Sequence, residues 1–125
     1  MKAKRLLIVS AVLEGATGLA LLAAPSAVVV YLAGAGLDGP AAILVGRITG
    51  AALLGIGLSC GVEGNREPGR EQRGLVLGLL VYNVAVPILL VSAALSAGLR
   101  GLLFWPVCIA HAALAIWCVR YLREG

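Results

Sequence analysis

Residues 74–97 read GLVLGLLVYNVAVPILLVSAALSA, a run without a single charged side chain. A helix that crosses the hydrocarbon core of a membrane needs about 20 consecutive apolar residues, so this run is long enough to span a bilayer. Inside the bilayer no water is present to bond the backbone, which must therefore satisfy its own hydrogen bonds, as a helix does. The run predicts a transmembrane helix.

Three further apolar runs meet the same length requirement. They cover residues of about 6–24, 41–61 and 101–122. We therefore expect an all-α integral membrane protein, a four-helix bundle that forms one transmembrane domain over residues 1–125. Between the first two runs, Pro25 opens a short apolar segment, and a proline at a first helical position predicts a short interfacial helix over residues 25–33.

The composition supports this class of protein. Hydrophobic residues make up 61% of the 125 residues and charged residues 13%, against roughly 25% charged in a soluble domain. The mean hydropathy is +1.02. The three cysteines, an odd number, have no CxxC spacing, which argues against a zinc ribbon or a disulfide framework. These values exclude an ordinary soluble domain, a disordered tail and a disulfide-stapled secreted module.

The basic residues are distributed unequally between the two sides of the predicted membrane. One side holds eight of them, and the other holds only Arg100, with Asp38 as its acidic counterpart; the eight are Lys2, Lys4, Arg5, Arg66, Arg70, Arg73, Arg120 and Arg123. Lysine and arginine favour the cytoplasmic side, so we expect both termini in the cytoplasm. The net charge of +4 then needs no nucleic-acid partner. The N-terminal run also resembles a secretory signal, but Glu14 within it predicts a retained helix.

Each predicted span carries one strongly polar residue at depth, namely Glu14, Arg47, Asn83 and His111. From the helical rise, these lie roughly 12, 19, 13 and 15 Å from the cytoplasmic face of a core about 30 Å thick. Ionised groups at that depth avoid lipid and pair with one another. We therefore expect a Glu14–Arg47 ion pair, with hydrogen bonds to Asn83 and His111, and treat these four as a polar core or ligand-binding layer.

Several residues are candidate neighbours of this layer. Pro87 lacks the N–H that would bond the Asn83 carbonyl, so a kink there would open space; Tyr82 and Cys108 are the other neighbours. Pairs of glycines four residues apart predict close helix contacts; they are Gly46 and Gly50, Gly57 and Gly61, and Gly74 and Gly78.

Catalytic and metal chemistry find little support in the sequence. We identify no hydrolase triad, no phosphate-binding glycine loop and no carboxylate pair, so we expect no catalytic residue and no enzymatic activity of this chain alone. His111 shares a helix face with Cys108 and Cys118, but a metal site would also need Glu14 as a ligand. We expect no metal and no cofactor, while haem or a quinone remain open alternatives.

The stretch VGRITGAALLGIGL at residues 45–58, with Glu14-Gly15 upstream and Asn83 and His111 downstream, resembles the small four-helix membrane proteins of bacteria that are called DoxX-like. The resemblance spans most of the chain. It implies a compact bundle in the bacterial inner membrane, and carries over fold and location more than function.

Two hypotheses for function follow from the polar layer. In the first, a non-enzymatic membrane protein uses the layer to hold its helices together and to bind a small lipophilic or redox-linked ligand, as an accessory or scaffold subunit. Its partners would be the bilayer and a second copy or a larger membrane complex. In the second, the chain is a small proton-coupled transporter or channel in which Glu14 titrates.

Overall fold

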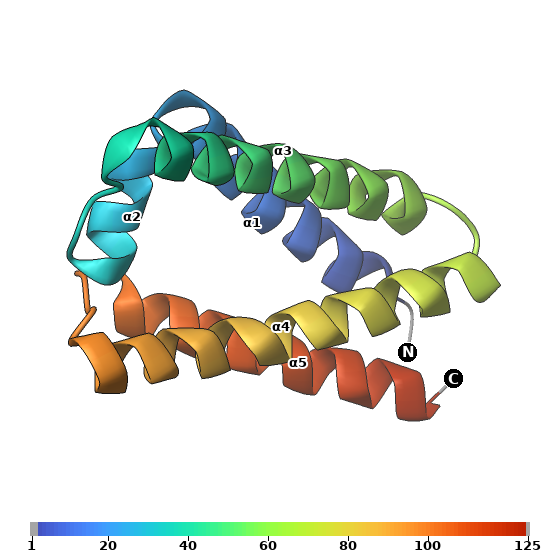
Figure 1. The fold of residues 1–125 in the computed structure, drawn as a ribbon. Coiled ribbons are helices and arrows are strands. Elements are labelled where there is room, and N and C mark those ends of the chain that lie inside the picture. The colour runs from blue at the N-terminus through green and yellow to red at the C-terminus, as the bar shows by residue number, and fades with distance from the viewer. Residues whose placement is uncertain (1–2, 125) are drawn as a thin grey trace.

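A computed structural model describes residues 3–124 as an all-helical chain (Figure 1). Four of its helices are long and apolar enough to cross a membrane, which confirms the predicted spans, and the short helix predicted after Pro25 is present. The elements are α1 (Lys4–Ala23), α2 (Pro25–Ala33), α3 (Gly39–Gly64), α4 (Arg70–Ala97) and α5 (Phe104–Glu124).

Proline and glycine set most of the helix boundaries. Ala24 precedes Pro25 and has φ −143° and ψ 68°, because a residue before proline avoids the helical region. The chain therefore breaks there and α2 begins with proline at its first turn. Gly34 and Gly98, with φ of 77° and 66°, end α2 and α4 in the left-handed conformation that glycine adopts without a steric penalty.

The four long helices form two pairs rather than one evenly packed bundle. α1 packs most extensively against α3, and α4 against α5, whereas contacts between the two pairs are few. Figure 1 shows the two pairs as separate layers, with α2 running across one end between them. We call α1 with α3 the first hairpin and α4 with α5 the second hairpin.

Glycines bring α1 and α3 into backbone contact. A Cβ atom at Gly18 would lie 2.5 Å from the backbone nitrogen of Leu54, and one at Gly57 would lie 2.7 Å from that of Gly15. The small-residue pattern of the second span is therefore an intramolecular packing surface, as expected in lipid. Gly74 and Gly78 differ, since a Cβ at either position would meet nothing within 4 Å in the described part of the chain.

The two hairpins meet at the end where α1 begins and α5 ends, which we call the closed end (Figure 1). Buried apolar residues from all four long helices pack there into one core; they are Ala3, Leu6, Leu7, Cys60, Val76, Leu79, Leu114, Cys118 and Tyr121.

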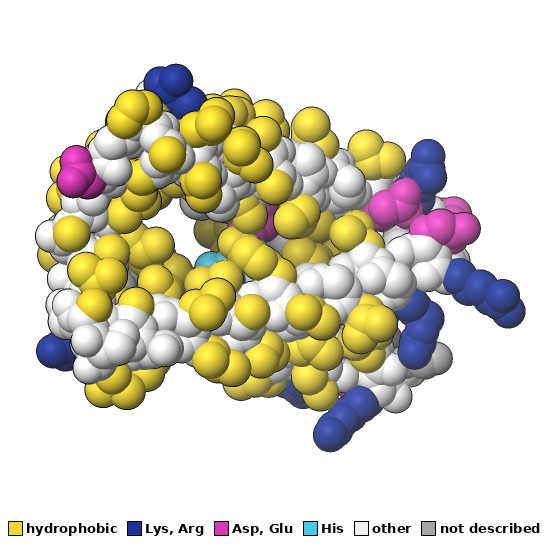
Figure 2. All heavy atoms as spheres, in the orientation of Figure 1, with side chains coloured by type: hydrophobic (Ala, Val, Ile, Leu, Met, Phe, Trp, Pro, Cys, Tyr) yellow, Lys and Arg dark blue, Asp and Glu magenta, His cyan; other side chains and the backbone are white. Residues whose placement is uncertain are grey.

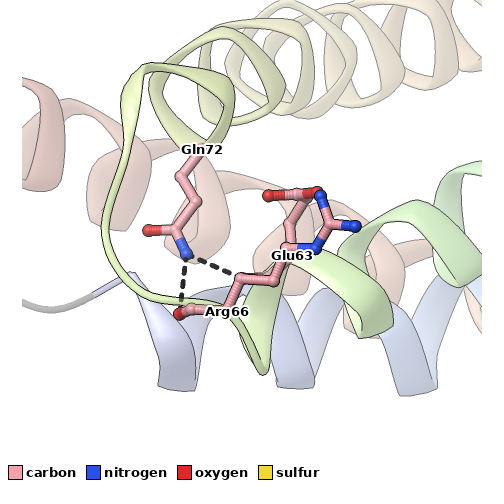
Figure 3. A network of polar contacts seen from close by, with 3 residues as sticks. All are labelled: Glu63, Arg66 and Gln72. Atoms are coloured by element: carbon pink, nitrogen blue, oxygen red, sulfur yellow. Dashed lines mark hydrogen bonds and ion pairs between the residues drawn. The ribbon is translucent and has the colours of Figure 1, made fainter.

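The loop between α3 and α4 also lies at the closed end, and hydrogen bonds from Gln72 hold it in place. The Gln72 Nε2 atom donates hydrogen bonds to the carbonyl oxygens of Glu63, at 2.7 Å, and Arg66, at 3.3 Å (Figure 3). Glu63 lies in the last turn of α3 and Arg66 just beyond it, where helical donors run out. The Arg66 guanidinium bonds the Glu63 carboxylate at 3.0 Å.

At the opposite, open end, α2 and the loop after α4 are what connect the hairpins. The backbone N–H groups of Gly101 and Leu103 donate to the carbonyl oxygens of Leu32, at 3.0 Å, and Tyr31, at 2.8 Å. Beneath this bridge the hairpins stay apart, and Figure 2 shows a hollow between them. We call it the lateral hollow, because it opens between helices rather than at their ends.

Candidate functional site

The structure brings Asn83 and His111 together, as the sequence predicts. The Nδ1 atom of His111 lies 2.7 Å from the Oδ1 atom of Asn83, and the Nδ2 atom of Asn83 donates to the carbonyl oxygen of Leu79 at 2.8 Å. Asn83 is fully buried, whereas His111 is partly exposed. This arrangement joins α4 to α5 within the second hairpin and leaves one edge of the imidazole accessible.

Tyr82 connects this pair to Glu14 on the other hairpin. Its ring packs edge-on against the imidazole of His111, with centroids 5.3 Å apart and planes at 83°. Its hydroxyl lies near the Glu14 carboxylate. Glu14 is only 3% exposed although it carries an ionisable group. Glu14, Tyr82, Asn83 and His111 form what we call the polar cluster.

The expected Glu14–Arg47 ion pair is wrong. Arg47 is exposed and forms no ion pair within residues 3–124. The reason is the rotation of α3: the close approach at Gly50 and Gly57 turns the glycine face toward α1. Arg47 precedes Gly50 by three residues and Gly57 by ten, which places its side chain about 60–80° around the helix from that face. Backbone packing, rather than charge pairing, sets the orientation of α3.

The two remaining predicted neighbours differ in their surroundings. Cys108 is 7% exposed and lies one turn before His111 on α5. Pro87 lies inside α4 without ending it. It lines a shallow groove with a volume of about 710 Å³ whose walls all come from α4 and include no member of the polar cluster; they are Pro87, Ile88, Val91, Ser92, Leu95 and Ser96.

Sequence reasoning missed two buried polar residues. Ser10 is 1% exposed, and its hydroxyl has no hydrogen-bond partner within the described chain. It precedes Glu14 by four residues, so the helical period places both on one face of α1, a signal that would have revealed it. Gln72, at 2% exposure, lies in the first turn of α4 among charged residues, so nothing in the sequence marks it as buried.

The lateral hollow reaches the polar cluster. In Figure 2 the chain's single histidine (cyan) and an acidic side chain (magenta) are visible inside the opening, behind a rim of apolar side chains. The four long helices run across this view (Figure 1), so in a bilayer, where they would stand along the membrane normal, the opening would face the acyl chains. The hollow is therefore apolar at its mouth and polar at its base, as small-molecule sites commonly are.

Metal binding has no geometric support in residues 3–124, where no group of three or more His, Cys, Asp or Glu side chains could hold an ion. What the polar cluster offers is hydrogen bonding, from a carboxyl, a phenol and an imidazole on three different helices.

Comparison with known protein families, with curated proteins and with solved structures finds no match for this chain. The polar cluster and the lateral hollow are therefore the features from which a function can be inferred.

Proposed function

We propose that this chain is a non-enzymatic membrane protein that binds a small lipophilic or redox-linked ligand in the lateral hollow, between its two hairpins. The observation that carries the proposal is the polar cluster at the base of the hollow, where Glu14, Tyr82 and His111 converge from α1, α4 and α5. Ionisable groups at membrane depth mark functional sites by default.

The charge distribution supports an orientation for the proposed protein. The described ends of α1 and α5 and the α3–α4 loop share the closed end (Figure 1), which carries most of the basic residues. Because lysine and arginine concentrate on the cytoplasmic side, we place the closed end in the cytoplasm. The bacterial inner membrane, suggested by the DoxX-like resemblance, is the proposed location, and an accessory or scaffold role in a larger complex is the proposed setting.

The test is to identify what remains bound after purification in mild detergent. Mass spectrometry of the extracted lipophilic molecules should find one compound enriched over the bulk lipid in the wild type. The enrichment should fall in Glu14→Gln and His111→Leu. It should persist in Val12→Ala and Ile109→Ala, which change side chains that are 64% and 65% exposed on the same two helices. Equal lipid composition in all five proteins would contradict the proposal.

A second candidate function is proton-coupled transport, with Glu14 as the titrating group. The observation that favours it is that Glu14, buried at membrane depth, forms no ion pair within residues 3–124, so no fixed cation there neutralises it. Proton flux into liposomes that contain a trapped pH dye would support transport if Glu14→Gln abolished it and Val12→Ala did not. Absence of flux in the wild type would remove this candidate.

A further inference from the structure

The hydrogen bonds of Asn83 determine which nitrogen of His111 carries a proton. Asn83 uses its Nδ2 amide to donate to the Leu79 carbonyl oxygen, so its Oδ1 atom is the one that faces His111. An amide oxygen only accepts hydrogen bonds. The Nδ1 atom of His111 is therefore the donor in this contact.

The other ring nitrogen, Nε2, is then an acceptor. In a neutral imidazole one nitrogen donates and the other accepts. A charged imidazole at this depth would need a counter-ion, and His111 forms no ion pair with a carboxylate in the described chain. No hydrogen bond to Nε2 is formed within residues 3–124 either. A lone pair is thus left without a protein partner.

The position of Nε2 favours contact with a ligand. The Nδ1 side of the ring is turned toward Asn83, which is fully buried. The part of His111 that remains exposed is consequently the edge that includes Nε2, and the histidine is visible in the lateral hollow (Figure 2). No hydrogen bond joins the Tyr82 hydroxyl to Nε2 within the described chain. The hollow therefore exposes a hydrogen-bond acceptor, His111 Nε2, to which no protein group donates within the described chain.

We propose that the ligand of the lateral hollow is a lipophilic alcohol whose hydroxyl group donates a hydrogen bond to His111 Nε2, with Asn83 as the positioning residue that keeps this nitrogen unprotonated. The proposal rests on the proposed binding function, since it requires an occupant of the hollow. A lipophile that only accepts, such as an ether, ester or ketone, leaves Nε2 unpaired in an apolar setting. The loss of one hydrogen bond corresponds to about tenfold weaker binding.

The protonation of His111 is tested first, on the unmodified protein. The chain has one histidine, so ¹⁵N-histidine labelling gives a single pair of ring-nitrogen signals. We expect a protonated Nδ1 and an unprotonated Nε2 in protein stripped of ligand by detergent exchange. In Asn83→Leu the preference of the proton for Nδ1 over Nε2 should disappear. A proton on Nε2 in the stripped wild type would overturn the proposal.

The ligand class is tested by titrating the same labelled protein with hexadecanol and with hexadecyl methyl ether, which differ in the hydroxyl donor. Hexadecanol should shift the Nε2 signal and bind about tenfold more tightly than the ether. In Asn83→Leu this ratio should approach one while binding of the alkyl chain persists. Equal binding of both probes to the wild type would overturn the hydroxyl proposal and leave the binding function standing.

A third probe, hexadecylammonium, separates recognition by His111 from recognition by the Glu14 carboxylate. If it binds more tightly than the alcohol and leaves the Nε2 signal unchanged, Glu14 selects the ligand and the hydroxyl proposal is overturned. If none of the three probes binds, the proposed binding function fails together with the inference.

Discussion

The interface within the first hairpin and the boundary between the hairpins are built differently. α1 and α3 meet through glycines whose missing side chains let the two backbones touch. Between the hairpins, apolar side chains pack at the closed end, and farther along the polar cluster borders an open hollow (Figure 2). Lipid supplies no hydrophobic force between helices, so adhesion comes from close packing. We infer that the well-packed interface provides most of the stability, and we propose that the loosely packed boundary binds the ligand.

The largest expected effect is on the glycine interface. Gly57→Ala adds a Cβ that would lie 2.7 Å from the Gly15 backbone nitrogen, an atom that no side-chain rotation can move. We expect it to lower the free energy of unfolding in detergent by about 3 kcal/mol, the upper part of the range for overpacking.

Gly55→Ala is the matched control, because a Cβ at Gly55 meets nothing within 4 Å. It should leave stability unchanged or raise it by up to about 1 kcal/mol, the gain in helix propensity. Equal losses in the two variants would show that α1 and α3 are not packed backbone to backbone.

The next effect concerns the closed end, the packed part of the boundary. Leu6→Ala removes a fully buried side chain from the shared core and should lower the free energy of unfolding by about 2 kcal/mol. Leu95→Ala, at a residue of α4 that is 84% exposed, should change it by less than about 0.5 kcal/mol. Thermal or denaturant unfolding in one detergent measures both free energies. Similar losses in the two variants would mean that the packing between the hairpins is not concentrated at the closed end.

The smallest expected effect is the coupling between Glu14 and Arg47. Because Arg47 is exposed and forms no ion pair with Glu14, a double-mutant cycle with Glu14→Leu and Arg47→Leu should be additive within about 0.5 kcal/mol. A coupling of about 3 kcal/mol or more, the value for a broken buried ion pair, would restore the ion pair that the sequence suggested and place α3 in a different rotation.

The sequence alone predicts those features of the fold that depend on local chemistry. The long apolar runs and the prolines predict the spans and α2, because membrane thickness and the chemistry of proline act locally. The 74–97 run accordingly appears as α4, Arg70–Ala97. That Asn83 and His111 belong to one polar layer was also predictable, since both residues lie at similar depth, whereas their direct contact was not.

The rotation of α3 was not predictable from residue types. Depth estimates place Glu14 and Arg47 within reach of each other, but they carry no information on which face of α3 meets α1. That choice depends on how several glycines fit against one backbone, a cooperative property of the pair of helices. The same limit hid the lateral hollow, because nothing in the four spans indicates that they pack as two hairpins.

The proposed function requires that the polar cluster be reached from the acyl chains through the lateral hollow. The most direct measurement is paramagnetic broadening of the single ¹⁵N-histidine signal pair in nanodiscs, with a spin label on lipid acyl chains compared with a water-soluble gadolinium chelate. We predict strong broadening of the His111 signals by the acyl-chain label and none by the chelate. Broadening by the chelate alone, or by neither agent, would contradict the account.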